Sequence, residues 1–394
     1  MGSSDSDWIN IELGEGISRR NVLSQLGAAA GVGAFSSLAG CAALQRGDGQ
    51  SNTQSKQRQG GDNTTEVPDY KRVELIPPPT TLNFNRDPPT RDIAMVTHDA
   101  STSFFVPTVA GLHDAARQVE WKATFTGPTS GFDVKKQISI LQSLVASGPD
   151  VIATTIASET SYINVIKEAL SKGISVITYN TNAMSNQQMQ KHFGRTLPYT
   201  GQRNFEAGYV CGLAFLEQLP DDAGRVTIGT SNPGQSSLKR RAEGIKLAIR
   251  KNSDLEITGV LDYTGQAATG TTKIANHIAS HPDLDGIVGT DAFSWFIGKA
   301  IKNQNATESI VGSGFDLPPK TIDYIKNGAM DSTIGQDPYS QGYMPTTTSW
   351  IYLDRGMPPK DYHTGATVLT SKNIDFAAKR ASSWSTLRQW QRSN

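Results

Sequence analysis

Asp316 and Gln336 have the residue types and the spacing of two polar groups that meet at one ligand site. Asp316 follows a glycine-rich apolar run, and Gln336 follows a second apolar run twenty positions later, with a helical pattern between the two runs. Parallel strands end at the same edge of a sheet, and open α/β sheets bind ligands at that edge. The pair therefore predicts a polar ligand site in a cleft between two domains.

Asp316 also has a purely structural interpretation. An aspartate before a helix accepts hydrogen bonds from the unpaired amides of the first turn, and a helix is predicted to start near Pro318. The two tasks are compatible, so Asp316 is predicted to be a ligand residue, a helix cap or both.

The elements that must position these groups alternate along the chain from residue 92 onward. Short apolar runs predict strands, and the periodic runs between them predict helices, so the strands of each series are parallel. Two such series predict an α/β protein with two doubly wound parallel-sheet lobes. The predicted strands are residues 93–97, 151–156, 174–179, 226–230, 257–261, 287–289, 310–314 and 366–369, and the predicted helices include residues 104–121, 162–172, 201–219 and 339–355.

The N-terminal segment reads as an export signal. Arg19 and Arg20 precede a weakly apolar, Gly/Ala-rich run, which is typical of a twin-arginine signal peptide. The run ends in Leu-Ala-Gly-Cys, which resembles a lipobox, so Cys41 is predicted to be lipidated. The alternative is an uncleaved anchor, although serines and glycines dilute the run below the roughly 20 apolar residues that a span needs. Either alternative places the folded part outside the membrane.

Composition separates a linker from the folded part of the chain. The stretch after Cys41 is rich in Gln, Gly, Asn, Thr and then Pro, which predicts a disordered tether. The predicted parts are a signal peptide at residues 1–41, a linker at 42–90, a first lobe of 91–197 with 337–365, and a second lobe of 198–336 with 366–380.

Five segments of the folded part occur in the order that characterises one known family. They are residues 96–107 (VTHDASTSFFVP), 177–183 (ITYNTNA), 238–244 (LKRRAEG), 289–292 (GTDA), and the paired runs around Asp316 and Gln336. Together they resemble the ribose-type periplasmic binding proteins, which are the sugar-binding components of ABC importers. The resemblance covers about residues 92–375 and implies the type 1 fold of that family, in which three crossovers join the lobes as a hinge and the ligand is held between them.

The resemblance also implies roles for individual residues. A sugar has weakly apolar faces and a rim of hydroxyl groups, so its site needs aromatic rings together with polar side chains. Phe104 and Phe105 would supply the rings, and Arg241, at the place of the family's sugar-binding arginine, would donate a two-pronged hydrogen bond. The other implied ligand residues are Asn180, Asp291, Asp316, Gln336 and His98. Each has a structural alternative: paired phenylalanines usually belong to a core, a basic helix run is usually solvated, and the histidine could cap its loop.

Departures from the ribose pattern concern the identity of the sugar. Asn180 begins an Asn-Thr pair where ribose binders have an aspartate and an arginine, and Asp291 stands where they have an asparagine. Gly265 lies opposite Phe104 where an aromatic ring is expected, with Tyr263 as the candidate replacement. The ligand class is therefore a monosaccharide or a similar small polyol, without a claim for ribose itself.

Composition and missing motifs exclude several other classes. The chain has 37 basic and 37 acidic residues, which argues against a nucleic-acid partner. His277 and His281 have helical spacing but lack the glutamate of a zinc protease, and no Gly-Lys-Ser/Thr is present to hold a nucleotide phosphate. We expect no cofactor, no metal, no catalytic residue and no enzymatic activity. A surface enzyme with Asp291 and Asp316 as paired carboxylates is the alternative that a turnover assay would test.

The sequence thus predicts a lipid-anchored, extracytoplasmic solute-binding protein. It would act as a monomer that captures a sugar-like ligand and delivers it to the permease and ATPase subunits of an ABC importer. The alternative is a sensory receptor that uses the same fold to signal to a transducer. Neighbouring genes would separate the two readings.

Overall fold

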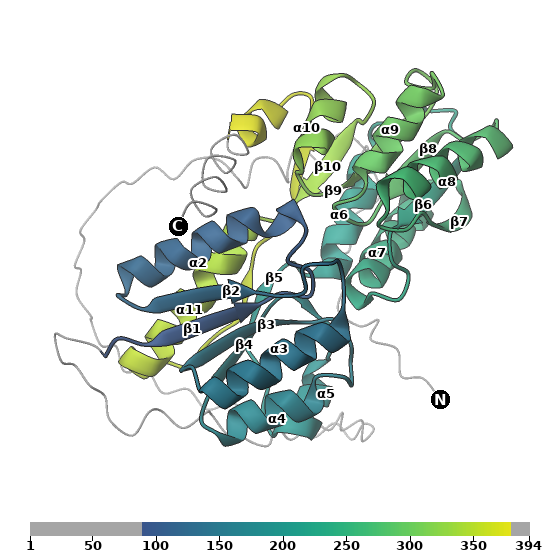
Figure 1. Ribbon diagram of the computed structural model, residues 1–394. Coiled ribbons are helices and arrows are strands. Elements are labelled where there is room, and N and C mark those ends of the chain that lie inside the picture. The colour runs from purple at the N-terminus through teal and green to yellow at the C-terminus, as the bar shows by residue number, and fades with distance from the viewer. Residues whose placement is uncertain (1–88, 380–394) are drawn as a thin grey trace, which may run out of the picture. The chain divides into compact units, whose positions relative to one another are not determined.

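The computed structural model describes residues 89–379, which form two α/β lobes, each built on its own six-stranded sheet (Figure 1). The first sheet has the order β11 (Tyr362–His363), β5 (Tyr199–Gly201), β4 (Ser175–Asn182), β3 (Val151–Ile156), β1 (Asp92–Val96) and β2 (Lys122–Thr126). The second has the order β12 (Thr367–Thr370), β10 (Ser332–Gly335), β9 (Val311–Phe315), β8 (Gly286–Gly289), β6 (Arg225–Thr230) and β7 (Glu256–Asp262). Within the described part, the strand pairs are parallel except β10 with β12. The predicted pair of doubly wound lobes is confirmed.

Helices cover both faces of each sheet. The first lobe contains η1 (Ser103–Phe105), α2 (Val106–Gln118), α3 (Val134–Ser147), α4 (Ile163–Ser171), α5 (Asn186–Phe193) and α11 (Pro338–Arg355). The second contains α6 (Asn204–Leu216), α7 (Ser236–Asn252), α8 (Ala267–Ser280), α9 (Trp295–Asn303) and α10 (Pro319–Lys326). In Figure 1, α3, α4 and α5 lie on one side of the first sheet and α2 and α11 on the other. None of these helices is both long and apolar enough to cross a membrane.

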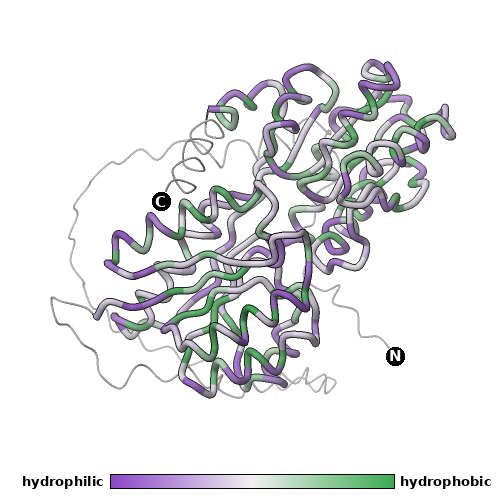
Figure 2. The backbone as a smooth tube through the Cα atoms, viewed as in Figure 1, coloured by the Kyte–Doolittle hydropathy of each residue, from purple (hydrophilic) through white to green (hydrophobic). Residues whose placement is uncertain are grey.

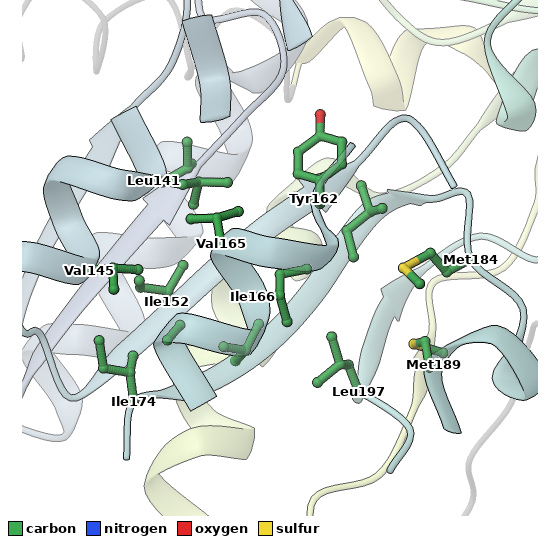
Figure 3. Packing of buried hydrophobic residues seen from close by; sticks show 14 residues of the cluster. Leu141, Val145, Ile152, Tyr162, Val165, Ile166, Ile174, Met184, Met189 and Leu197 are labelled. Carbon is green, nitrogen blue, oxygen red and sulfur yellow. The ribbon is translucent and has the colours of Figure 1, made fainter. Parts of the chain in front are cut away.

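Consecutive residues of one strand pack into hydrophobic cores on opposite faces of its sheet. In β8, Ile287 packs with α8 and α9, whereas Val288 packs with α6 and α7. In β3, Ile152 belongs to the cluster under α3 and α4, which Figure 3 shows, whereas Val151 packs on the α2 side. Side chains on a strand point alternately to the two faces, so a sheet covered on both faces needs apolar residues at consecutive positions. The helices need only one apolar face, and Figure 2 shows hydrophobic and hydrophilic stretches alternating along them.

Two helix pairs approach so closely that glycine is required at their contacts. A Cβ on Gly342 of α11 would collide with the backbone of Thr108 in α2, and a Cβ on Gly208 of α6 would collide with the backbone of Arg241 in α7. Glycine has no Cβ, so the backbones can touch. The second contact fixes where α7 places its arginine.

Three short connections join the lobes. Residues 202–203 lead from β5 to α6, residues 336–337 from β10 to α11, and residues 364–366 from β11 to β12. The predicted helix from residue 201 is wrong at its start. Pairing of Gly201 with His363 in β11 keeps the backbone extended, and α6 begins at Asn204.

The sequence did not predict β2 and α3. The edge strand β2 carries Lys122, Thr124 and Thr126 and is only partly buried, so it lacks the apolar run that marks the other strands. The predictions for Cys41, for the signal peptide at residues 1–41 and for nearly all of the linker at 42–90 lie outside the described residues.

Candidate functional site

Five of the eight predicted ligand residues lie at or near the carboxyl ends of five strands. His98 follows β1, Asn180 lies near the end of β4, Asp291 follows β8, Asp316 follows β9 and Gln336 follows β10. All five are buried, with exposed fractions of 8% or less. Burial of so many polar groups requires that they bond to one another or to a ligand.

Two of these residues have an unusual backbone conformation. Asn180 has a φ of 56° and Asp316 a φ of 69°, both in the left-handed region. Asparagine and aspartate enter this region more readily than most residues, at some cost in strain. The left-handed conformation occurs within the last residues of β4 at Asn180 and directly after β9 at Asp316.

Gln336 links the polar groups of the two lobes. Its Nε2 donates to Asp316 Oδ1 at 2.5 Å, and its Oε1 accepts from Gln341 Nε2 at 3.1 Å and, at 3.5 Å, from Asn180 Nδ2. Asn180 Nδ2 also donates to Gln341 Oε1 at 2.9 Å. The residues twenty positions apart in the sequence are therefore direct partners, and they join a first-lobe asparagine to a second-lobe aspartate.

Arg241 is held by three protein acceptors. Its Nε donates to Asn204 Oδ1 at 3.0 Å, Nη1 to the Thr290 carbonyl at 3.0 Å, and Nη2 to Gln202 Oε1 at 2.9 Å. The guanidinium carbon lies 4.3 Å from the centre of the Phe315 ring, which supports it from one face. A guanidinium has five N–H donors, so one on each terminal nitrogen remains for a ligand.

Opposite charges face this arginine. Burial lowers the pKa of Arg241 from its ordinary value, whereas Asp316, Tyr199 and Asp291 raise it. Burial likewise raises the pKa of Asp316 to about 6, against the lowering by Arg241 and Gln336. Charges of both signs are thus gathered in one desolvated place.

Asp316 does not cap the helix after it. Helix α10 has Pro318 at its N-cap and no side-chain cap bond, so the capping interpretation is wrong. In the left-handed conformation the carboxylate turns toward Gln336 instead. Within residues 89–379, Asp316 Oδ2 has no hydrogen-bond partner, and it is not among the fully enclosed polar atoms. This oxygen is free to accept from a ligand.

Asp291 is occupied by protein donors. Its oxygens accept from the amides of Ser231 and Phe293, both at 2.9 Å, from the Tyr263 hydroxyl at 3.1 Å, and from the Thr290 hydroxyl at 3.4 Å. A carboxylate offers about four lone-pair sites, and these donors fill them. The geometry suits Asp291 to orienting the loop after β8 and to supplying negative charge.

The first-lobe rings differ in exposure. Phe105 is buried in the core, while Phe104 is half-buried and packs edge-on against it with ring centres 4.9 Å apart. His98 contacts Phe105 on one side and Phe132 on the other, with ring centres 5.6 and 5.4 Å away. Phe132 is 40% exposed, and it lies in the loop before α3, which the sequence did not assign to any element. It joins Phe104 as a ring that a ligand could reach.

Tyr263 cannot take the place of a ligand-stacking ring. It is fully buried, because it packs edge-on against Phe296 in the second-lobe core. The ring beside Gly265 belongs to Phe293, which would lie 3.5 Å from a Cβ at that position. The linear spacing used for the sequence prediction missed it, since Phe293 arrives from the loop after a different strand.

Two buried glutamines complete the site and were not predicted. Gln202 and Gln341 are at most 1% exposed, and each uses both ends of its amide on site residues or on interlobe connections. The signal in the sequence is weak, because glutamine at a helix start is usually solvated.

Residues 93–356 match the family described as "Periplasmic binding protein domain". The xylose/arabinose-binding protein XylF of Sulfolobus acidocaldarius is 29% identical over 314 residues, which cover 76% of this chain and 76% of that protein. The ribose import binding protein RbsB of Haemophilus influenzae is 23% identical over 259 residues, which cover 65% of this chain and 84% of that protein.

Solved structures share the fold. A periplasmic solute-binding protein from Actinobacillus succinogenes with bound D-allose has a TM-score of 0.67 at 20% identity, and the match covers 73% of this chain and 99% of that one. A carbohydrate transporter solute-binding protein from Agrobacterium radiobacter, in complex with D-arabinose, has a TM-score of 0.65 at 22% identity, covering 75% of this chain and 99% of that one.

Proposed function

Because the chain belongs to the periplasmic binding protein domain family, we propose that it captures a monosaccharide or a similar small polyol between its lobes and delivers it to an ABC permease. The match confirms the family resemblance expected from the sequence. The named relatives are binding proteins, in agreement with the expectation that the chain is not an enzyme. Their xylose, arabinose and ribose, with the allose and arabinose bound in structural neighbours, support a sugar as the ligand.

The observation that carries the proposal is the bond of Gln336 to Asp316 beside Asn180. Residues from both lobes meet there with unused hydrogen-bonding capacity: two donors on Arg241 and one acceptor oxygen on Asp316. A sugar hydroxyl donates and accepts at once, so adjacent hydroxyls can bridge a guanidinium and a carboxylate. A ligand that contacts both lobes favours the conformation in which they are close, and a permease can recognise that conformation.

The charges favour a neutral ligand. Arg241 is the buried cation of the site, and two buried carboxylates, Asp291 and Asp316, already face it. A phosphate or carboxylate ligand would add a further negative charge beside these aspartates, at a cost that burial increases. A neutral polyol avoids that repulsion.

The apolar faces of such a ligand would contact aromatic rings from each lobe. Phe104 and Phe132 in the first lobe and Phe293 in the second are the half-buried or exposed rings near the polar groups. Stacking on the C–H faces of a sugar adds contact area without new hydrogen-bond demands. The fully buried Phe105 would support Phe104.

The remaining parts of the proposal concern location. The family is periplasmic. Lipidation of Cys41 after twin-arginine export would anchor a monomer at the membrane surface through the linker at 42–90. The folded lobes would be those at 91–197 with 337–365 and at 198–336 with 366–380.

A thermal-shift screen of the whole chain against pentoses, hexoses, deoxysugars and nucleosides tests the proposal. At least one sugar should raise the melting temperature of the wild type, and Asp316→Asn should lose most of that increase because its side chain is a weaker acceptor. Asp331→Asn is the matched control. Asp331 precedes β10, at the amino ends of the strands of the same sheet, and its carboxylate accepts a hydrogen bond from the Gly312 amide. A wild type that responds to no sugar, or an Asp316→Asn variant that responds as strongly as the control, would contradict the proposal.

A further inference from the structure

A buried chain of hydrogen bonds leads from the first-lobe core to His98. The Tyr162 hydroxyl donates to Gln137 Oε1 at 2.6 Å, Gln137 Nε2 lies 3.0 Å from Thr155 Oγ1, and Thr155 Oγ1 lies 3.1 Å from His98 Nδ1. Tyr162, Gln137 and Thr155 are fully buried. Figure 3 shows the Tyr162 ring at the border of the aliphatic cluster, with its hydroxyl pointing away from those side chains. This series of hydrogen bonds therefore connects the buried core of the first lobe to His98, a residue of the candidate site.

The orientation of the Gln137 amide is fixed by a backbone carbonyl. One end of the amide lies 2.9 Å from the Thr155 carbonyl oxygen, which can only accept, so that end must be the nitrogen. The amide oxygen consequently faces Tyr162, whose hydroxyl must donate. Burial raises the pKa of Tyr162 to about 12, so this hydroxyl keeps its proton.

The Thr155 hydroxyl then has one direction left for its own proton. It lies next to Gln137 Nε2, which can only donate, and next to His98 Nδ1, and in the part of the chain that the structure describes it has no other hydrogen-bond partner. If Nδ1 carried a proton, two donors would point at the hydroxyl and its own proton would be stranded in a fully buried place. Nδ1 must therefore accept, and it is unprotonated.

The other ring nitrogen of His98 holds the proton. Burial lowers the pKa of His98 to about 4, with Asp99 raising it, so the ring is neutral near neutral pH and carries a single N–H. With Nδ1 accepting, that proton is on Nε2. Among residues 89–379, Nε2 has no hydrogen-bond partner, and it is not one of the fully enclosed polar atoms, so a ligand atom can reach it although the residue is buried.

We propose that Gln137 and Thr155 are positioning residues that fix His98 with its proton on Nε2, so that His98 donates a hydrogen bond to an acceptor oxygen of the ligand. The nature of the ligand rests on the proposed function; the position of the proton does not. The specificity that follows is for a sugar with a hydroxyl or ring oxygen at that point, against an analogue in which the oxygen is replaced by hydrogen. Such an analogue leaves the N–H without an acceptor.

Nitrogen NMR of the whole chain labelled with ¹⁵N-histidine tests the proton position without any ligand. The chain has 6 histidines, and the His98 signals are those missing from a His98→Gln variant. In the wild type near neutral pH, His98 should show an unprotonated Nδ1 and a protonated Nε2. In Thr155→Val, which removes the hydroxyl at similar volume, the other tautomer should become populated. Wild-type His98 with the proton on Nδ1 would overturn the proposal, and this outcome needs neither threonine variant to fold.

Thr154→Val is the matched control. Thr154 is equally buried on the same strand and lies 3.2 Å from Gln137 Nε2, but it has no hydrogen bond to His98. Thr154→Val should leave the His98 tautomer unchanged. It should lose stability as Thr155→Val does, because both variants replace a buried threonine by valine. The same tautomer shift in both variants would show that general repacking, not the Thr155 hydroxyl, controls the ring, and the proposal would fall.

Sugar titrations separate this inference from the proposed function. For a sugar that stabilises the wild type, Thr155→Val should weaken binding on the order of tenfold relative to Thr154→Val, since a hydrogen bond to the ligand is weakened in the first variant only. Equal affinities of the two variants would overturn the donor role of His98. If the wild type responds to no sugar, the proposed function is overturned. The NMR measurement of the His98 tautomer without ligand would still test the position of the proton.

Discussion

Arg241 Nη2 donates to Gln202 Oε1 at 2.9 Å, so the arginine of the candidate site is bonded to a residue of an interlobe connection. The Nε2 of the same glutamine donates to the Gly365 carbonyl at 2.8 Å and lies 3.5 Å from the Gly335 carbonyl. Gln202 belongs to the first connection, Gly335 immediately precedes the second, and Gly365 lies in the third. One buried side chain thus ties all three connections to the guanidinium. A change in the path of any connection is expected to move Arg241.

Replacing Gln202 by leucine should weaken ligand binding and stability together. The change leaves an N–H of Arg241 and the Gly365 carbonyl without their partner, and each unpaired buried group costs about 1–3 kcal/mol. We expect a comparable loss in the free energy of unfolding, measured by chemical denaturation, and at least tenfold weaker sugar binding, measured by calorimetry. Gln187→Leu, at an exposed position of α5, is the control and should change neither quantity. Unchanged binding by the Gln202 variant would show that the connections do not position the arginine.

The pH dependence of stability should report on Asp316. Its pKa is raised from 3.8 to about 6, so the folded state holds this proton more tightly than the unfolded state does. The stability that protonation contributes is complete below pH 3.8 and is lost as the pH rises through about 6. Asp316→Asn stays neutral and should be the more stable protein above about pH 6, by ~3 kcal/mol for a difference of this size.

Denaturation of the unliganded wild type and of Asp316→Asn, from about pH 4 to about pH 7.5, checks this expectation. The two free energies of unfolding should converge toward the acid end and separate as the pH rises. Parallel curves across the range would mean that Asp316 is not perturbed in the folded protein. Asp331→Asn again serves as a control at the far edge of the same sheet, and burial raises the pKa of that carboxyl too. The difference between the Asp316 and Asp331 variants therefore measures how much of the pH-dependent change in the free energy of unfolding is specific to the candidate site.

Phe132 should contribute to binding more than to folding. It is 40% exposed and touches His98, so its truncation removes little core packing. If it stacks on a sugar face, Phe132→Ala should weaken binding by about 1 kcal/mol, or roughly fivefold, with a nearly unchanged melting temperature of the unliganded protein. Phe376→Ala, at a 66% exposed ring that follows β12 in the sequence, provides the comparison. Identical affinities of the two variants would remove Phe132 from the site.

The Asp316–Gln336 partnership was predictable because it follows from a local rule. Each residue ends a buried strand, the strands β9 and β10 are adjacent and parallel, and parallel strands bring their ends to one edge. Asn180 and His98 were assigned to the site by resemblance to a family, and the structure places them near the end of β4 and after β1. Resemblance to a family added Arg241, which spacing alone would have assigned to a solvated helix face.

The glutamine network was not predictable from the sequence for a different reason. Gln202 bonds to Gly365, 163 positions away, and Asn180 bonds to Gln341, 161 positions away. No periodicity relates such residues, since their proximity depends on how separate connections are threaded between the lobes. Tyr263 failed for a related reason: a residue near the end of a strand can face either the ligand edge or the core, and only packing decides which.

Gly208 offers the most direct test of how the fold places Arg241. A Cβ at this position would collide with the carbonyl group of Arg241, so Gly208→Ala must push α6 and α7 apart. Such overpacking typically costs about 1–3 kcal/mol, and the displaced backbone carries the guanidinium away from its acceptors. We therefore expect a lower melting temperature and a larger loss of sugar affinity than the loss of stability alone would cause. Gly224→Ala is the control, because a Cβ there meets no atom closer than 3.9 Å and should be neutral or slightly stabilising. A Gly208 variant that melts at a lower temperature but binds sugar as tightly as the control would show that the contact between α6 and α7 does not determine the position of Arg241.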